Sequence, residues 1–447
     1  MGRVSVTKAV DPNRMRPDDR PVHDWYRFVL SYPPHLVRDY LERLGIGTSD
    51  TVLDPFCGTG TTLVECKKRG VASVGLERNP MAHFASSVKV DWSVDPGRLA
   101  EYSDAVAQSA KATLTDEGVD DWTDLPLLTG NGPGPASIRT LEPSRSKLLL
   151  KNSISPVPLH KTLVTLDAVD RLGDPQMRAY GRLALATGLV RTIGNLRFGP
   201  EVGVGRIKSD ASVVDIWHAN MKTIITDIRA VSNGPAATAG VLRADARDAG
   251  GVLPPQSIDA VVTSPPYPNE KDYTRTTRLE SVILGFIRHP KDLRALKRGM
   301  VRSNTRGVYR LDDDDIAVEA YPEIGTIADE IERRRVALGK TSGFERMYAR
   351  VVKLYFGGMA RHLASLRTVL RPGAKLAYVV GDQASYLRVM IRTGQLLAGI
   401  AQSLGYEVID IDLFRTRLAT ATRAQLREEV LLLRWPGDSS SEANHGN

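Results

Sequence analysis

The sequence has few cysteines and no long apolar run. Its two cysteines, Cys57 and Cys66, are too few for a disulfide framework or a zinc site of four thiolates, and they fit a reducing, cytoplasmic compartment. No run of 18 apolar residues occurs, so no transmembrane helix is expected. Residues 1–20 contain no apolar segment of the kind found in secretory signals. The eight histidines are scattered without ligand spacing, so we expect no metal site.

The composition is that of an ordinary globular protein. Of 447 residues, 42% are hydrophobic and 25% are charged, which excludes a wholly disordered or fibrous chain. The length is enough for about three domains, or for one large domain with insertions. Lys plus Arg number 60 against 52 Asp plus Glu, a net charge of +8. This basic excess permits a polyanionic partner such as nucleic acid.

The positive charge is concentrated in one segment. Residues 271–310 hold eleven Lys or Arg and three acids, a local excess of +8 that equals the excess of the whole chain. Four consecutive aspartates, Asp312 to Asp315, follow directly. Either the segment is a solvated charged face, or it is a surface that contacts phosphates. Its position directly after a proline-rich motif favours the second interpretation.

Short apolar runs alternate with helical patterns along much of the chain. This alternation predicts an α/β fold, a parallel sheet with helices on both faces, in which ligands bind at the carboxyl ends of the strands. The predicted strands are 51–54, 72–77, 257–263, 375–381, 406–413 and 429–434. The predicted helices between them are 36–44, 61–69, 348–370 and 393–404.

Two stretches interrupt the alternation. Residues 91–240 form a large, mostly helical insertion, with amphipathic patterns at 162–196 and 211–231, and residues 268–345 form a basic insertion. The α/β domain is thereby split into 21–90 and 241–436. We expect a flexible arm at 1–20 and a disordered tail at 437–447, because both lack a hydrophobic pattern.

A glycine-containing loop follows the first predicted strand, in the sequence Asp-Pro-Phe-Cys-Gly-Thr-Gly-Thr-Thr at 54–62. Gly58 and Gly60 let the backbone approach a ligand closely, where a Cβ would collide. Thr61 and Thr62 open a helix whose unpaired N–H groups face that ligand. A tight strand-to-helix turn without a ligand would show the same pattern.

An acid at the end of the next strand strengthens the ligand interpretation. Glu77 can accept hydrogen bonds from both hydroxyls of a ribose. The third glycine of a dinucleotide-binding fingerprint is missing, because Leu63 stands in its place. The pattern therefore favours a nucleoside ligand without a pyrophosphate.

A rigid turn follows the strand at 257–263. Ser264-Pro265-Pro266-Tyr267 contains two consecutive prolines, which fix two φ angles and remove two N–H donors. The Pro265 carbonyl and the Ser264 hydroxyl can accept protons from an exocyclic amine, and Tyr267 can stack on a planar ring. A proline-stiffened loop is the alternative interpretation.

Together, the motifs at 54–62 and 264–267 resemble those of the S-adenosylmethionine-dependent DNA amino-methyltransferases, which methylate N4 of cytosine or N6 of adenine. The resemblance extends to 31–35 and 371–382, and covers about 22–90 and 240–435. It implies a Rossmann-like class I methyltransferase sheet, interrupted here by the helical insertion. It also implies that 91–240 is a candidate target-recognition region.

The resemblance implies a set of cofactor-binding residues. Asp245 would lie beside the adenine amine of the cofactor, although it comes 168 residues after Glu77 because the insertion falls between them. The residues implied to bind S-adenosylmethionine are Tyr32, Asp54, Pro55, Phe56, Gly58, Gly60, Thr61, Thr62, Glu77 and Asp245.

The resemblance also implies a catalytic turn and a DNA partner. Ser264, Pro265, Pro266 and Tyr267 would hold a base that has been flipped out of double-stranded DNA. Cys57 lies inside the cofactor loop, which argues against a carbon-5 cytosine mechanism. The basic insertion would contact phosphates through Arg275, Arg278, Arg302, Arg306 and Arg310.

Several alternatives stay open. Serine at position 264 favours N4-cytosine, because N6-adenine enzymes more often carry Asp or Asn there. An RNA guanine methyltransferase would more often show Asp-Pro-Pro-Tyr-Gly and an extra N-terminal domain, and a relative that binds DNA without catalysis is a further alternative. The loop at 195–201 could approach the base pocket. The expected location is cytoplasmic, at the nucleoid through DNA, and an accompanying restriction or defence protein is left open.

Overall fold

The computed structural model describes residues 15–27, 31–121, 138–199, 201–235, 237–418 and 425–437. Its centre is a seven-stranded sheet with the strand order β5-β2-β1-β6-β7-β9-β8. The predicted α/β, Rossmann-like sheet is confirmed. The strands are β1 (Thr51–Asp54), β2 (Ala72–Leu76), β5 (Ala239–Leu242), β6 (Ile258–Thr263), β7 (Leu370–Gly381), β8 (Glu407–Leu418) and β9 (Gln425–Arg434).

One strand departs from the predicted parallel arrangement. β9 runs antiparallel to both β7 and β8, while β5, β2, β1, β6 and β7 pair in parallel. A parallel connection needs a crossover of a dozen or more residues. β8 ends at Leu418 and β9 begins at Gln425, so the chain between them is too short for one. The prediction that 429–434 is a parallel strand was therefore wrong.

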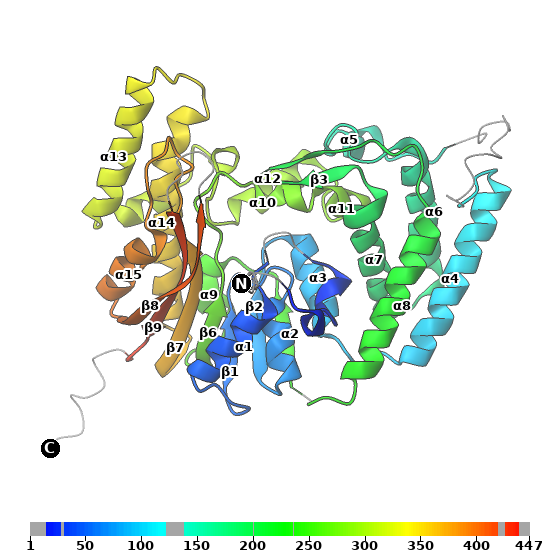
Figure 1. The fold of residues 1–447 in the computed structure, drawn as a ribbon, viewed down its shortest axis with the longest axis horizontal. Helices are drawn as coiled ribbons and strands as arrows, with labels where there is room; N and C mark the ends of the chain where they lie inside the picture. Colours follow the sequence, from blue (N-terminus) through cyan, green and yellow to red (C-terminus); the bar gives the residue numbers. More distant parts are fainter. Residues whose placement is uncertain are drawn as a thin grey trace, which may run out of the picture.

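Alternate residues of the strands pack against helices on opposite faces of the sheet (Figure 1). Val52 and Val262 lie in the core that α1 (Pro34–Arg43) covers, together with Cys66 of α2 (Thr61–Lys68). Their neighbours Leu53 and Val261 lie in the core on the other face. The helices of that face are α9 (Ala249–Val252), α14 (Tyr348–Leu366) and α15 (Thr393–Ser403).

The insertion after β2 and α3 (Pro80–Val90) is mostly helical, as predicted. A single amphipathic stretch expected at 162–196 is broken at Pro175, where one helix ends and another begins. Its elements are α4 (Pro96–Asp116), α5 (Pro143–Ser146), α6 (Pro156–Leu172), α7 (Pro175–Gly188), β3 (Leu196–Phe198), β4 (Val202–Val204) and α8 (Val213–Val231), with one short π-helical turn at Leu189–Ile193.

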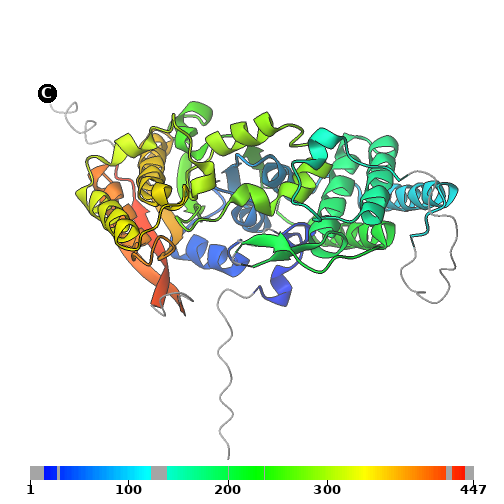
Figure 2. The ribbon, with the colours of Figure 1, turned by 90° about the horizontal axis from the view of Figure 1, so that it is seen from above.

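The insertion shares a hydrophobic core with the cofactor side of the sheet. Leu63 of α2 and Met81 of α3 belong to the same buried cluster as Trp217 of α8. The segment before α1 joins the two parts, because Asp227 of α8 accepts hydrogen bonds from the Val22 amide and the Trp25 ring, each at 2.8 Å. The sheet with its covering helices and the helical insertion lie side by side along the long axis of the molecule (Figures 1 and 2).

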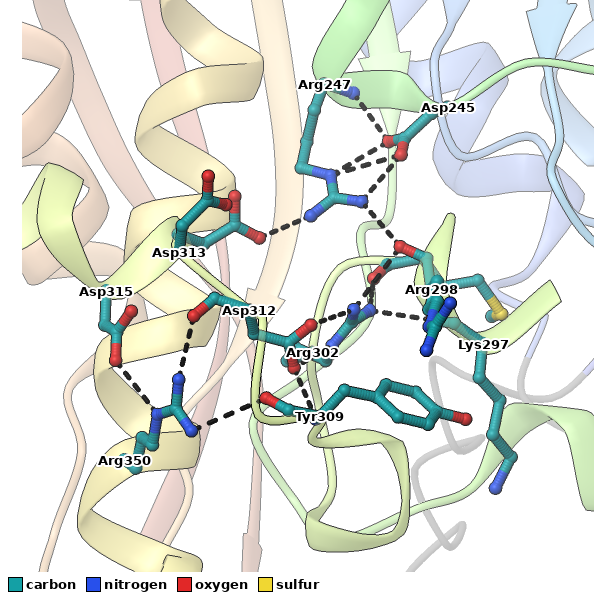
Figure 3. A network of polar contacts seen from close by, with 12 residues as sticks. Asp245, Arg247, Lys297, Arg298, Arg302, Tyr309, Asp312, Asp313, Asp315 and Arg350 are labelled. Atoms are coloured by element: carbon teal, nitrogen blue, oxygen red, sulfur yellow. Dashed lines mark hydrogen bonds and ion pairs between the residues drawn. The ribbon is translucent and has the colours of Figure 1, made fainter. Parts of the chain in front are cut away.

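The segment after β6 pairs its basic residues with its own acids. Arg302 forms a two-pronged contact with Asp312, and Arg350 of α14 binds Asp315 at 3.0 Å (Figure 3). Its helices are α10 (Tyr273–Thr276), α11 (Arg278–Ile283), α12 (Pro290–Arg298) and α13 (Pro322–Ala337), with short 3-10 turns at Thr305–Gly307, Asp314–Val318 and Glu345–Met347.

The N-terminal end has more structure than the predicted arm of 1–20. Pro17–Asp19 form a 3-10 turn, and Asp19 is buried in an ion pair of 2.5 Å with Arg38. A second 3-10 turn spans His23–Trp25. Outside this N-terminal region, a 3-10 turn at Ala246–Asp248 follows β5. Most of the predicted flexible ends, residues 1–14 and 438–447, lies outside the described residues. Within the described part of the chain, no helix has the length and apolarity needed to cross a bilayer.

We expect Gly357→Ala in α14 to destabilise the fold. A Cβ on Gly357 would lie 1.7 Å from the Asp314 carbonyl oxygen, so the aspartate segment must move away from the helix. Overpacking of this kind costs about 1–3 kcal/mol or more. Urea unfolding should show that loss in the free energy of unfolding.

Gly399→Ala in α15 is the matched control, because a Cβ there meets nothing within 4 Å. It should instead stabilise by about 0.5–1 kcal/mol through helix propensity. Equal unfolding free energies for the two variants would contradict the close packing of α14 on the aspartate segment.

Candidate active site

A cavity of about 780 Å³ opens at the carboxyl edge of the sheet. It brings together two motifs that lie about 200 residues apart in the sequence. The predicted site residues that line it are Tyr32, Pro55, Phe56, Gly58, Thr61, Glu77, Asp245, Ser264, Pro265, Pro266 and Tyr267. The remaining predicted residues, Asp54, Gly60 and Thr62, lie behind this lining.

Asp54 is a buried link between the two motifs, with 1% of its surface exposed. Its Oδ1 accepts from the Thr263 hydroxyl at 2.6 Å and the Phe56 amide at 3.2 Å, and its Oδ2 accepts from the Tyr32 hydroxyl at 3.2 Å. Burial raises the pKa of Asp54 to about 6, although these hydrogen bonds lower it. Asp54 thus fixes the cofactor loop to the end of β6 without facing the cavity.

The loop between β1 and α2 depends on glycine at two positions. Gly58 and Gly60 have φ angles of +52° and +82°, which disfavour other residues. A Cβ on Gly60 would also lie 3.0 Å from the Cβ of Ser86. Behind them, Thr62 ties the start of α2 to β6 by donating to the Val262 carbonyl at 3.1 Å.

Glu77 is held in place by the backbone of both neighbouring loops. Its Oε2 accepts from the Gly58 amide at 2.9 Å, and its Oε1 accepts from the Asn79 amide at 2.6 Å. Each oxygen keeps a further lone pair for a donor in the cavity. Burial raises the pKa of Glu77 to about 7, although both backbone hydrogen bonds lower it.

Asp245 follows β5 and lies in the cavity wall, as Glu77 does. Arg247 binds both of its carboxylate oxygens, at 2.6 to 3.2 Å (Figure 3). The same guanidinium contacts Asp314 and donates to the Arg298 carbonyl at 3.1 Å. The insertion after β6 is therefore joined directly to the end of the cavity that contains Asp245.

His362 of α14 supports the same end of the cavity from behind. Its ring lies edge-on to Phe56, with 4.9 Å between ring centroids. Nδ1 lies 2.8 Å from the Ala246 carbonyl and Nε2 lies 2.7 Å from the Tyr378 hydroxyl. Burial lowers the pKa of His362 to about 4, so the ring is neutral, with Nδ1 donating and Nε2 accepting.

The Ser-Pro-Pro-Tyr turn forms the other end of the cavity. The Ser264 hydroxyl donates to the Val379 carbonyl of β7 at 3.2 Å, which leaves the lone pairs of its oxygen for a donor in the cavity. The Tyr267 amide donates to the Tyr273 hydroxyl at 3.2 Å. The Tyr267 ring lies against Gly381, where a Cβ would come within 3.1 Å of it.

Several cavity residues were not predicted from the sequence. Most come from the insertion after β6 and from the β8–β9 hairpin, where no short motif marks them, and the others lie beside the ends of β2, β5 and β7 or just before α1. They are Ser31, Asn79, Ala246, Asn269, Lys271, Tyr273, Met300, Val301, Gln383, Phe414, Arg415, Arg417 and Glu428. One sequence feature could have indicated that Tyr273 lines the cavity, namely its position six residues after Tyr267.

The five arginines predicted to contact phosphates fall into two groups. Arg302 is 4% exposed and binds Asp312, and Arg278 donates to the Thr274 hydroxyl at 2.8 Å and the Leu148 carbonyl at 3.4 Å. Both guanidinium groups are used inside the fold, because carbonyls and a carboxylate replace water around them. We therefore remove these two arginines from the predicted DNA surface.

The other three arginines lie nearer the surface. Arg306 and Arg310 are exposed, and Arg275 is partly exposed. Arg275 and Arg306 both lie 3.4 Å from Glu201, which places the loop at 195–201 beside the segment that follows the catalytic turn. Their contact with DNA stays a prediction.

Cys57 lies in the cavity wall but is unsuited to nucleophilic attack. The thiol is buried, and burial together with the nearby Glu77 raises its pKa well above the ordinary value. A thiol with a raised pKa carries little thiolate at neutral pH. The geometry therefore agrees with a mechanism that uses no cysteine.

Known proteins resemble this chain in sequence over most of its length. A sequence profile described as DNA methylase, N6_N4_Mtase, matches residues 11–86. The Type II methyltransferase M.BsoBI of Geobacillus stearothermophilus is 25% identical over 452 residues, which cover 93% of this chain and 86% of that protein. The Type II methyltransferase M.AvaI of Anabaena variabilis is 22% identical over 445 residues, covering 93% and 87%. The chain therefore resembles DNA methyltransferases of the N4/N6 amino type along most of its length.

The methyltransferases that the chain resembles use S-adenosylmethionine, which agrees with the predicted cofactor. The chain also resembles the tRNA (guanine(10)-N2)-dimethyltransferase of Methanothermobacter thermautotrophicus, at 30% identity over 125 residues. That match covers 26% of this chain and 32% of the tRNA enzyme. The two Type II relatives, in contrast, match along most of this chain.

We expect Glu77→Ala to weaken cofactor binding. The change removes the acceptor that faces the cavity, and charge-assisted hydrogen bonds of this kind contribute roughly 2–3 kcal/mol. Calorimetry should show an affinity for S-adenosylmethionine about 30- to 150-fold lower. An unchanged affinity would remove Glu77 from the cofactor site.

Cofactor affinity should also depend on pH through the same residue. With a pKa of about 7, Glu77 is mostly protonated at pH 6 and mostly ionised at pH 8, and only the ionised form accepts from two donors at full strength. The dissociation constant should therefore fall by about 10-fold from pH 6 to pH 8. Glu77→Gln should flatten this profile, and a profile equally steep in that variant would assign the titration to another group.

Proposed function

We propose that this protein transfers a methyl group to the exocyclic N4 of a cytosine flipped out of double-stranded DNA. The observation that carries the proposal is the placement of Ser264. Its hydroxyl proton is directed to the Val379 carbonyl, so its oxygen is left as an acceptor at the wall of the cavity. An acceptor at this point suits an amine that must give up conjugation with its ring.

The cofactor would bind at the end of the cavity that contains Glu77 and Asp245. Glu77 would accept from the two ribose hydroxyls, and Asp245 would receive the adenine amine while Arg247 holds its carboxylate in place. The glycine loop and the first N–H groups of α2 would lie against the methionine part. When bound, S-adenosylmethionine supplies an electrophilic methyl group.

The target base would bind at the end formed by the Ser-Pro-Pro-Tyr turn. Ser264 Oγ and the Pro265 carbonyl would accept the two protons of the amine, which draws its nitrogen toward a tetrahedral geometry. Tyr267 would stack on the ring. The amine nitrogen would form a bond to the methyl carbon as that carbon's bond to the sulfonium sulfur breaks, and it would release one proton to water. Holding the amine in line with the transferred methyl can contribute several kcal/mol to lowering the barrier.

Two observations favour cytosine over the alternatives. Position 264 is serine, whereas N6-adenine enzymes more often have Asp or Asn there. Pro268 follows Tyr267, where an RNA guanine methyltransferase would more often have glycine. Base flipping follows from the position of the turn inside the cavity, because a base stacked in a duplex cannot reach it.

Mapping the modified base tests this proposal. The purified protein would be incubated with unmethylated plasmid DNA and isotopically labelled S-adenosylmethionine, and the digested nucleosides would be separated by mass spectrometry. Labelled N4-methylcytosine is expected. N6-methyladenine would overturn the choice of base, and label found in transfer RNA but not in DNA would overturn the choice of nucleic acid.

Tyr267→Ala should impair methyl transfer far more than cofactor binding. Loss of the stacking ring is worth roughly 1–3 kcal/mol per base, so the rate of DNA methylation should fall by about 5- to 150-fold. The affinity for S-adenosylmethionine should stay within about 2-fold of the original value. Tyr267→Phe keeps the ring and should stay close to the original rate; if the alanine variant does so too, the base pocket lies elsewhere.

A further inference from the structure

A small hairpin of the helical insertion lies beside the catalytic end of the cavity. β3 and β4 form this two-stranded antiparallel ribbon, separate from the main sheet. β3 is labelled near the top of the molecule in Figure 1, and the ribbon can also be seen in the view from above (Figure 2). Nothing in the proposed chemistry uses it.

The hairpin is tied to the catalytic turn by a short chain of contacts. The Tyr267 amide donates to Tyr273 of α10, and Arg275 of the same short helix donates to the Val202 carbonyl at 3.2 Å. Arg275 and Arg306 both pair with Glu201, the residue just before β4. The hairpin is therefore held at a fixed place beside the entrance for the target base.

The two faces of the hairpin differ in character. Phe198 pairs with Val202 on one face, and Val202 is buried. Arg197 pairs with Gly203 on the other face, where the arginine is exposed. A Cβ added to Gly203 would meet nothing within 4 Å, so the fold itself leaves room for a larger side chain there.

The exposed side of the hairpin is positively charged. Arg197 of β3 and Arg206, which comes after β4, are both exposed. Neither forms an ion pair with any residue that the structure describes. Arg275 and Arg306 add charge at its base, where Glu201 is their shared acid. This charge is complementary to phosphates.

We propose that the β3–β4 hairpin lies against the DNA duplex next to the flipped base, with Arg197 and the open side of Gly203 facing the DNA. The inference rests on the proposed function, because it needs a duplex with one base in the cavity. A two-stranded ribbon fits the major groove of B-DNA. DNA is favoured over a protein partner because the face with Arg197 and Gly203 offers an exposed basic group, while the exposed apolar side chain of β4, Val204, lies on the other face.

The test uses Gly203→Val in the full-length protein. The added side chain would point toward the DNA and not into the fold, so the KM for unmethylated plasmid DNA should rise by about 10-fold or more. Arg197→Gln should raise the same KM by about 5-fold. The affinity for S-adenosylmethionine and the melting temperature should be unchanged in both.

Gly240→Val is the matched control. Gly240 lies in the edge strand β5, and a Cβ there also meets nothing within 4 Å, but the strand has no part in the proposed DNA surface. This variant should keep the original KM for DNA. If Gly203→Val lowers the melting temperature, Arg197→Gln, a change at an exposed side chain, decides the test.

The outcomes separate the two proposals. If the original protein methylates the plasmid and both hairpin variants keep its KM, the hairpin does not face the duplex, and this inference fails while the proposed function stands. If the original protein transfers no methyl group to plasmid DNA, the proposed function fails. A loss in Gly240→Val as large as that in Gly203→Val would also overturn the inference.

Discussion

One buried carboxylate, Asp54, connects the parts on which the site depends. It accepts hydrogen bonds from Thr263 at the end of β6, from the Phe56 amide in the cofactor loop and from Tyr32 ahead of α1. A buried carboxylate needs such partners, because leaving it unpaired would be costly. The same contacts therefore satisfy Asp54 and set the spacing between the cofactor loop and the catalytic turn.

A second set of charges joins the cofactor end of the cavity to the segment that follows the catalytic turn. Arg247 holds Asp245 and also contacts Asp314, while Arg302 holds Asp312 (Figure 3). The excess of positive charge at 271–310 is thus partly neutralised by the aspartates that follow it. Within that segment the exposed basic residues are Arg288, Lys291, Arg294, Arg298, Arg306 and Arg310. Arg197 in the hairpin and Arg206 after it add exposed positive charge from the helical insertion.

The fold and the two motifs could be predicted from the sequence because both are local signals. Runs such as Thr51–Asp54 and Ile258–Thr263 are short and apolar, and they end in the residues that form the site. The glycines at 58 and 60 and the prolines at 265 and 266 restrict or require particular backbone angles wherever they occur. The direction of β9 could also have been deduced, from the short connection after β8.

What the sequence by itself determined was the sheet, the cofactor loop, the acid after β2 and the Ser-Pro-Pro-Tyr turn. Only the tertiary structure decided which charges are available to a partner. Arg302 and Arg306 are four residues apart and look alike in sequence, yet one is enclosed by Asp312 and backbone carbonyls and the other is exposed. The fold also brought Val202 of the hairpin beside Arg275, across 73 residues of sequence, because burial and ion pairing depend on contacts between distant segments.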